Sequence, residues 1–285
     1  MRDQTGRKGD AFQDQVVWIT GASSGIGAAL VHEFIDQGAR VVLSARRESE
    51  LNNVSRECVE GGCDAARLLV LPLDVTHYDA MPAAVQQVLD TFGGIDLLIN
   101  NAGLSQRSLC LDTDMDVYRQ LLEVDVLGQI ALTKSVLPHM VTRGSGHLAV
   151  TASVAGKVGA PLRTGYCAAK HAVMGFFDAL RTEVAHQNIR VTTIIPGFIR
   201  TDIARNALTG TGAPAGMADG DIDGGMDVQA CARMIVDGFV AGQEEIDVGV
   251  GPEMDLLKLK RDNPTAAFRL MEAMAADALT SRAAE

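Results

Sequence analysis

Residues 16–27 read VVWITGASSGIG, and this stretch decides the fold class of the chain. Its initial apolar run is typical of a strand, which Gly21 ends. Beyond the turn, apolar side chains recur at helical spacing over residues 26–37. A glycine-rich turn between a strand and a helix is the context of a dinucleotide site. Gly21 permits the sharp turn, and Gly25 and Gly27 allow both close approach of the pyrophosphate and close packing of the helix on the strand. The helix N-terminus offers free N–H groups.

The rest of the chain repeats this alternation of strand and helix. We expect further strands near residues 39–45, 68–73, 95–100, 146–153, 189–195 and 245–250. We expect helices near residues 26–37, 48–60, 78–92, 116–141, 164–186 and 228–241. The strands are almost continuously apolar, as in parallel sheets that are covered on both faces. The pattern predicts a single doubly wound, Rossmann-type α/β domain over residues 15–253, with about seven parallel strands and helices on both faces.

Three segments depart from the alternation. Residues 1–14 are polar, contain no apolar signal-peptide core and are expected to form a disordered tail. Residues 206–225 are rich in glycine and follow the sixth expected strand at the end where ligands bind, which favours a substrate lid over plain disorder. Residues 254–285 are expected to form a helical extension. Within it residues 264–282, rich in Ala and Met, either pack on a partner or flank the pocket.

The composition restricts the classes of function. The 285 residues are 47% hydrophobic, which excludes global disorder and provides for a large core. The net charge of −11 argues against a nucleic-acid surface and against anchoring on anionic lipid. No apolar run is long enough to span a bilayer, so no membrane partner is expected. The five cysteines are scattered and odd in number, which suits reduced thiols in a cytoplasm better than a disulfide framework. No histidine pair has ligand spacing, so no metal site is expected.

Tyr166 and Lys170 form a second informative pattern, with Ser153 upstream. A phenol is a poor acid or base at neutral pH, because it titrates near pH 10 when unperturbed. In a helix Lys170 lies one turn after Tyr166 on the same face, where its ammonium favours the tyrosinate. The Ser153 hydroxyl can donate to a carbonyl or alcohol oxygen during reaction. Each residue alone is more often structural, but their order and spacing predict a proton-transfer site.

The end of the second expected strand indicates which nicotinamide dinucleotide is bound. An acidic residue about 20 residues beyond the glycine turn would bind a free ribose 2′-hydroxyl. Here Ala45 is followed by Arg46 and Arg47, so no carboxylate repels a 2′-phosphate and a guanidinium is available to bind it. We therefore expect NADP(H), with Arg46 as the main contact, and regard NAD(H) as the weaker alternative.

These motifs together resemble the short-chain dehydrogenase/reductase family over roughly residues 15–250. The resemblance is carried by TGASSGIG at 20–27, Asp74-Val75, NNAG at 100–103, Ser153, Tyr166 with Lys170, and Pro196-Gly197 with Thr201. Residues 100–113, 132–140 and 165–181 further resemble the member-7 branch of the dehydrogenase/reductase group. That branch implies an enzyme that reduces lipophilic carbonyls with NADPH, and its N-terminal membrane anchor is not expected here.

The resemblance implies a role for each matched residue. Tyr166 would be the general acid in reduction, and Lys170 would also hold the nicotinamide ribose. The adenosine and pyrophosphate would meet residues of the turn and of the following strand ends: Gly21, Ser23, Ser24, Gly25, Ile26, Gly27, Arg46, Arg47, Asp74, Val75, Asn101, Ala102 and Gly103. The nicotinamide half would meet Tyr166, Lys170, Pro196, Gly197, Ile199 and Thr201.

One candidate catalytic residue departs from the family pattern. The family usually places an asparagine in the long helix before the serine strand, where it completes a proton relay through water to the lysine. Here Asp125 stands at this position, within EVDVLG. Two consequences are open. The relay is preserved if the main-chain carbonyl holds the water, or the carboxylate pairs with Lys170 and weakens its effect on Tyr166.

The sequence supports three hypotheses of function. The first is an NADP(H)-dependent oxidoreductase that interconverts an alcohol and a ketone or aldehyde. The second is a cofactor-binding regulatory or scaffold protein on the same fold, which only Asp125 favours. The third and weakest is a hydride-using epimerase or dehydratase.

The substrate and the assembly are also expectations. The substrate is expected to be a small lipophilic carbonyl or alcohol, because the candidate pocket is mostly apolar. Its residues are Leu104, Ser105, Val154, Pro161, Leu162, Phe198, Ile203 and Leu208. A homodimer or homotetramer is expected, since relatives pair subunits through the helices that correspond to residues 116–141 and 164–186.

Overall fold

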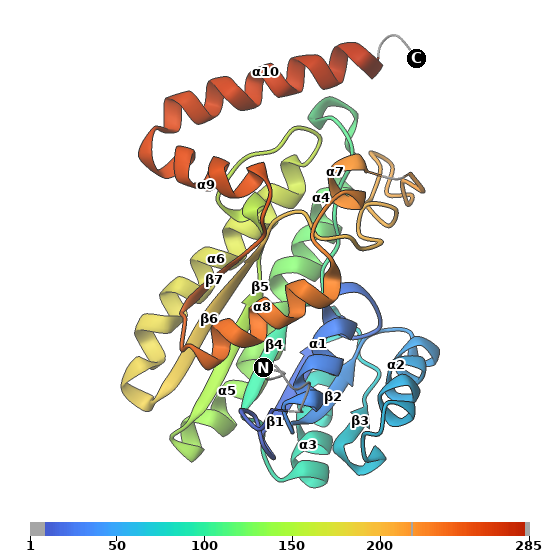
Figure 1. Cartoon of the computed structure of the whole chain (residues 1–285), viewed down its shortest axis with the longest axis vertical. Helices are drawn as coiled ribbons and strands as arrows, with labels where there is room; N and C mark the ends of the chain where they lie inside the picture. Colours follow the sequence, from blue (N-terminus) through green and yellow to red (C-terminus); the bar gives the residue numbers. More distant parts are fainter. Residues whose placement is uncertain (1–8, 218, 283–285) are drawn as a thin grey trace.

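The computed structural model describes residues 9–217 and 219–282. Within these residues seven parallel strands form one sheet in the order β3-β2-β1-β4-β5-β6-β7 (Figure 1). The strands are β1 (Val16–Thr20), β2 (Arg40–Ser44), β3 (Leu68–Val70), β4 (Leu97–Asn100), β5 (Gly146–Thr151), β6 (Ile189–Pro196) and β7 (Glu245–Val248). The seven expected strands are confirmed, although several are shorter than predicted.

Helices cover both faces of the sheet, because strand side chains alternate between two cores. Val17 and Ile19 lie in one core and Val16 in the other. The first core is closed by α1 (Gly25–Asp36), α2 (Glu48–Glu60) and α8 (Val228–Val240). The second is closed by α3 (Met81–Phe92), α5 (Gly128–Arg143) and α6 (Thr164–Val184). This arrangement confirms the doubly wound, Rossmann-type class.

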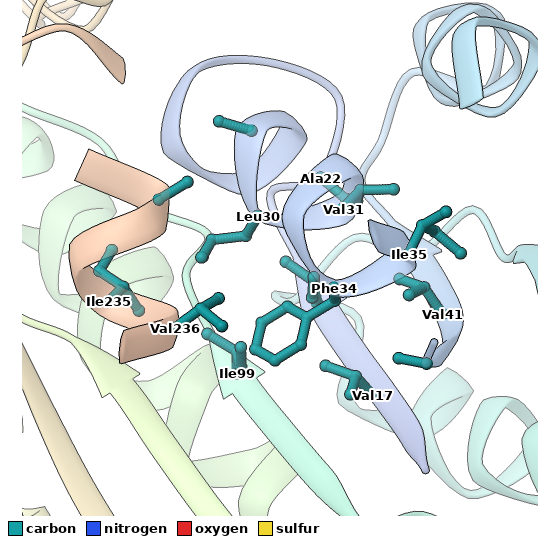
Figure 2. Packing of buried hydrophobic residues seen from close by; sticks show 14 of the residues in the cluster. Val17, Ala22, Leu30, Val31, Phe34, Ile35, Val41, Ile99, Ile235 and Val236 are labelled. Atoms are coloured by element: carbon teal, nitrogen blue, oxygen red, sulfur yellow. The ribbon is translucent and has the colours of Figure 1, made fainter. Parts of the chain in front are cut away.

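The helix after the glycine turn is fixed by its apolar face. Figure 2 shows Phe34 of α1 pointing toward the strand residues Val17 and Ile99, and Leu30 toward Val236 of α8. Phe34 is fully buried, and truncation of such a side chain to alanine costs about 3–5 kcal/mol. The same contacts that hold α1 on the sheet therefore hold the turn at its start.

Part of the predicted N-terminal tail packs against the body of the protein. Phe12 is 7% exposed and meets the Phe34 ring edge-on at a centroid distance of 4.9 Å. Its N–H donates a hydrogen bond to Gln37 O. One buried aromatic side chain thus fixes a segment whose neighbours are polar. Residues 9–14 differ in this way from the disordered tail predicted over residues 1–14, and residues 1–8 lie outside the described residues.

The long helix predicted over residues 116–141 is interrupted. The structure has α4 (Met115–Leu122), a π-helical turn η4 (Glu123–Leu127) and then α5. A π-helical turn is rare, and it is often found at functional sites. Here it contains Asp125, whose side chain is fully buried. The apolar period of the sequence did not reveal the interruption, because both halves of the helix keep their buried face.

Segment 206–225 is bound to the body of the protein where the structure describes it. Leu208 N donates to Ser105 O and Arg107 N donates to Leu208 O, each at 2.8 Å. A short helix, α7 (Gly220–Asp223), follows within the segment. That the segment acts as a lid stays a prediction.

Two helices follow β7, in agreement with the expected helical extension. They are α9 (Pro252–Asp262) and α10 (Pro264–Arg282). Figure 1 shows α10 in red at the end of the molecule where α7 and α9 also lie. The division of the chain into a domain over residues 15–253 and an extension stays a prediction.

Candidate active site

A cavity of about 1000 Å³ lies at the carboxyl ends of the strands. Its walls contain the expected residues Gly21, Ser23, Ser24, Gly25, Ile26, Arg46, Arg47, Asp74, Val75, Asn101, Ala102, Gly103, Ser153, Tyr166, Lys170, Pro196, Gly197, Ile199 and Thr201. Of the expected substrate pocket it contains Leu104, Ser105, Val154, Phe198, Ile203 and Leu208. Four expected residues are absent from the walls: Gly27, Asp125, Pro161 and Leu162. The fold thus brings together most, but not all, of the residues that the sequence singled out.

The glycine turn is locked against the loop after β4. Thr20 Oγ1 accepts hydrogen bonds from Asn101 N at 2.9 Å and from Ala102 N at 3.0 Å. Gly21 has a φ of +66°, and a Cβ there would lie 3.0 Å from the Ala102 Cα atom, so glycine is required. A Cβ on Gly27 would lie 2.2 Å from Gly21 O. Gly27 therefore lets the helix pack closely on the turn, which is one of its two expected roles, and it is not among the residues that line the cavity.

The start of α1 fits the phosphates of a dinucleotide. Ser24, at its N-cap, is extended and its side chain caps no backbone N–H, and no acidic residue lies in the first turn. Ser23, Gly25 and Ile26 line the cavity beside it. Free N–H groups and the positive end of the helix dipole are therefore available to an anion at this wall.

The wall near β2 suits the adenosine end of the cofactor. Arg46 and Arg47 are exposed and line the cavity directly after Ala45. Asp74 Oδ1 accepts hydrogen bonds from Thr76 N at 3.0 Å and from Thr76 Oγ1 at 2.8 Å. Burial raises the pKa of Asp74, but the hydrogen bonds from Thr76 and nearby positive charge outweigh it and hold the pKa below its usual value. This wall therefore combines two guanidinium groups with an ionised acceptor.

Three of the four expected catalytic side chains, those of Ser153, Tyr166 and Lys170, line the same cavity. Tyr166 and Lys170 are one turn apart in α6, with the Lys170 Nζ atom 5.6 Å from the centre of the Tyr166 ring. Ser153 follows β5, and its Oγ atom accepts a hydrogen bond from Ala155 N at 3.1 Å. The same hydroxyl donates to Pro196 O at 3.4 Å. Because that second bond is long, the hydroxyl can turn toward a ligand at little cost.

Lys170 is a buried cation with two oxygen partners. Its Nζ donates to Thr151 O at 3.0 Å and lies 3.3 Å from Asp125 Oδ2, and the two side chains are 4% and 0% exposed. Burial lowers the pKa of Lys170, but the Asp125 carboxylate outweighs it and the pKa lies above its usual value. Asp125 Oδ1 also accepts a hydrogen bond from Leu104 N at 2.7 Å. Asp125 thus contacts Lys170 without lining the cavity. Two consequences were predicted for Asp125, a preserved water relay or pairing with Lys170, and the structure contains the pairing.

The far wall of the cavity was missed by the sequence motifs. Leu256 of α9 and Leu270, Met271 and Met274 of α10 line it. Of the two roles left open for the C-terminal segment, these residues flank the pocket. No motif marks them, because only the tertiary structure brings these two helices to the cavity.

No group of three or more His, Cys, Asp or Glu side chains among residues 9–217 and 219–282 could hold a metal ion. Over the same part of the chain, no helix combines the length and the apolar character needed to cross a membrane.

Comparison with known proteins gives consistent matches. The sequence model of a family described as short chain dehydrogenase matches residues 15–211. The chain is 43% identical over 263 residues to dehydrogenase/reductase SDR family member 7 of Homo sapiens, covering 92% of this chain and 78% of that protein. A short chain dehydrogenase/reductase from Burkholderia phymatum in complex with NAD has a TM-score of 0.78 at 22% identity, covering 89% of this chain and 95% of that one. A metagenomic short-chain oxidoreductase in complex with NADP has a TM-score of 0.68 at 26% identity, covering 84% of this chain and 98% of that one.

We predict that Asp125→Asn keeps or raises turnover and lowers stability. Asparagine still accepts the Leu104 N–H but no longer neutralises Lys170, whose charge then acts on Tyr166 alone. Removal of one partner of a buried ion pair destabilises a protein by about 3–5 kcal/mol. Steady-state rates and urea unfolding of the two proteins measure both effects. A well-folded Asp125→Asn protein with much lower turnover would show that the carboxylate itself takes part in the reaction.

Proposed function

Because the chain belongs to the short-chain dehydrogenase/reductase family, we propose that it is an NADP(H)-dependent oxidoreductase that interconverts an alcohol and a ketone or aldehyde. One observation carries this proposal: Ser153, Tyr166 and Lys170 line the same cavity as the glycine turn. A nicotinamide ring and a reacting carbonyl can therefore meet in one space, next to groups that transfer a proton.

In this proposal Tyr166 moves the proton. Its hydroxyl protonates the carbonyl oxygen in reduction, and its phenolate accepts the alcohol proton in oxidation. The Ser153 hydroxyl donates to the same oxygen, while the Ala155 N–H keeps the Ser153 Oγ atom in place. The Lys170 ammonium stabilises negative charge on the phenol from one helical turn away. NADP(H), when bound, supplies or takes up the hydride.

The preference for NADP(H) over NAD(H) rests on the residues after β2. Arg46 and Arg47 offer guanidinium groups to a 2′-phosphate, and Ala45 stands where an acidic residue would select the free 2′-hydroxyl. Of the two solved structures described above, one is a complex with NAD and the other is a complex with NADP. A nicotinamide cofactor is thus supported by relatives, and the choice between the two is our proposal.

A lipophilic substrate is supported by the apolar side chains that line the cavity. Leu104 and Phe198 line it, and segment 206–225 adds Leu208 and Ile222. Apolar walls with few polar groups favour ligands that bury hydrocarbon. The contribution of segment 206–225 supports its role as a lid. Assembly as a homodimer or homotetramer, and location in the cytoplasm, stay predictions.

The pairing of Asp125 with Lys170 favours one alternative function. If the carboxylate neutralises the lysine fully, the protein would bind cofactor without turnover, as a regulatory or scaffold protein. Tight NADPH binding without turnover of any carbonyl would select this alternative.

We predict that Tyr166→Phe abolishes most of the turnover and leaves cofactor binding intact. Loss of a general acid costs about 10²–10⁴-fold in rate, whereas the phenyl ring still fills the wall. NADPH oxidation is followed across steroid, quinone, retinal and short-chain keto substrates, and NADPH affinity is measured by fluorescence titration. Equal turnover by the Tyr166→Phe and wild-type proteins would refute the assigned role of the phenol.

We predict that Arg46→Ala weakens NADPH binding and leaves NADH binding unchanged. A hydrogen bond to a charged group contributes about 1.5–3 kcal/mol, which corresponds to about 10–100-fold in Kd. Arg47→Ala is the matched control and is expected to have the smaller effect. A wild-type kcat/KM that is higher with NADH than with NADPH would overturn the cofactor assignment.

A further inference from the structure

Gln106 is a buried polar residue that the mechanism above does not use. It is fully buried and is absent from the cavity walls. Its Oε1 atom accepts hydrogen bonds from Gly165 N at 2.6 Å and from Tyr166 N at 3.4 Å. These are the second and third residues of α6. A side chain from a distant loop therefore contacts the helical turn that carries Tyr166.

The start of α6 needs such a partner. The first N–H groups of a helix have no acceptor within the helix. Arg163, at the N-cap, provides no side-chain acceptor. Gly165 lets the amide approach, because a Cβ there would lie 2.9 Å from Gln106 Oε1. The amide oxygen of Gln106 thus caps these N–H groups, as the side chain of a serine or aspartate at the N-cap usually does.

The other end of the Gln106 side chain is fixed as well. Its Nε2 atom donates to Ser108 Oγ and to Thr113 Oγ1, each at 3.1 Å. The two hydroxyls also lie 2.8 Å from each other, and Thr113 Oγ1 donates to Leu109 O at 2.6 Å. The amide is therefore held on both sides, with its oxygen directed at the helix.

The main chain of Gln106 connects α6 with segment 206–225. Gln106 O accepts a hydrogen bond from Arg163 Nη1 at 2.5 Å. Arg163 in turn pairs with Asp219 at 2.8 Å. The hydrogen bonds of Leu208 to the residues on either side of Gln106 join the same segment to this loop. The proposed substrate lid and the helix of Tyr166 thus share one anchor.

We propose that Gln106 is a positioning residue, which fixes the first turn of α6 and so sets the place of the Tyr166 phenol in the cavity. This inference rests on the proposed function, in which that phenol transfers the proton. Lys170, one turn further on, has its own partners in Thr151 and Asp125. Loss of the Gln106 acceptor therefore displaces the phenol more than the lysine or the cofactor walls.

The test compares Gln106→Met with Gln106→Glu. Methionine has similar length and volume but accepts no strong hydrogen bond, whereas a glutamate oxygen still accepts from Gly165 and Tyr166 at the positive end of the helix. Kd for NADPH, kcat and KM are measured at the optimal pH of each protein. Hydrogen–deuterium exchange of the peptide that contains residues 164–170 reports the first turn of α6 directly.

We expect kcat of Gln106→Met to fall at least about tenfold, because a displacement near 1 Å can cost about 10²-fold in rate. Kd for NADPH is expected to stay close to the wild-type value, and amide exchange over residues 164–170 to become faster. Gln106→Glu is expected to recover most of kcat and the slow exchange. A folded Gln106→Met protein with wild-type kcat and exchange would overturn the inference.

Thr192→Val is the matched control for a general loss of stability. Thr192 is 2% exposed, and its hydroxyl contacts Gln243 O and His147 away from the cavity. At equal loss in melting temperature it is expected to keep kcat. If it loses kcat as Gln106→Met does, and Gln106→Glu restores nothing, the role of Gln106 is merely structural and the inference is wrong.

If Gln106→Met does not fold, Ser108→Ala takes its place, because it removes one hydrogen-bond partner of the Gln106 amide. This variant is expected to have a lower kcat and an unchanged Kd for NADPH. A wild-type kcat in Ser108→Ala would reject the inference. If the wild-type protein turns over no carbonyl, the proposed function fails. The exchange data then decide alone: faster exchange in Gln106→Met but not in Gln106→Glu supports the anchoring of α6, and equal exchange rejects it.

Discussion

The buried ammonium of Lys170 is the constraint around which the cavity is built. A charge removed from water is stable only beside an opposite charge or strong hydrogen-bond partners. Asp125 and the carbonyl of Thr151 provide these partners. Asp125 lies in the π-helical turn between α4 and α5 and also accepts the N–H of Leu104, in the loop after β4. One ion pair therefore ties α6, the interrupted helix and a cavity wall together.

The parallel sheet supplies the other half of the geometry. Its strand ends meet at one edge, so the turn after β1, the arginines after β2 and Ser153 after β5 come together although they are far apart in the sequence. Phe34 holds α1 on the sheet from one face. On the opposite face of the sheet, the Gln106 side chain accepts a hydrogen bond from the first turn of α6. The positions of the glycine turn and of Tyr166 are thus each supported by a buried contact outside the cavity.

The fold could be predicted from the sequence because strands and helices alternate with clear apolar periods and a glycine turn marks the first crossover. The part of the site that lies in short motifs at the strand ends could be predicted as well. Phe12 escaped prediction because one aromatic residue makes no periodic pattern. The π-helical turn escaped because an apolar stripe does not register one extra residue per turn. Of the two roles expected for Gly27, the structure contains the close packing of the helix, and its approach to a ligand stays a prediction, since sequence spacing does not separate the two. The roles of Gln106 and of the lining residues of α10 could not be predicted, because only tertiary contacts reveal them.

The central claim is that the buried charge of Lys170 acts on Tyr166 during turnover. The most direct measurement is kcat for Lys170→Met in the Asp125→Asn background, compared with Asp125→Asn alone, so that no buried carboxylate is left without a partner. Our account predicts a loss of at least about 10²-fold in kcat, which is the lower end of the contribution of general acid–base catalysis. Equal kcat in the two proteins would contradict it.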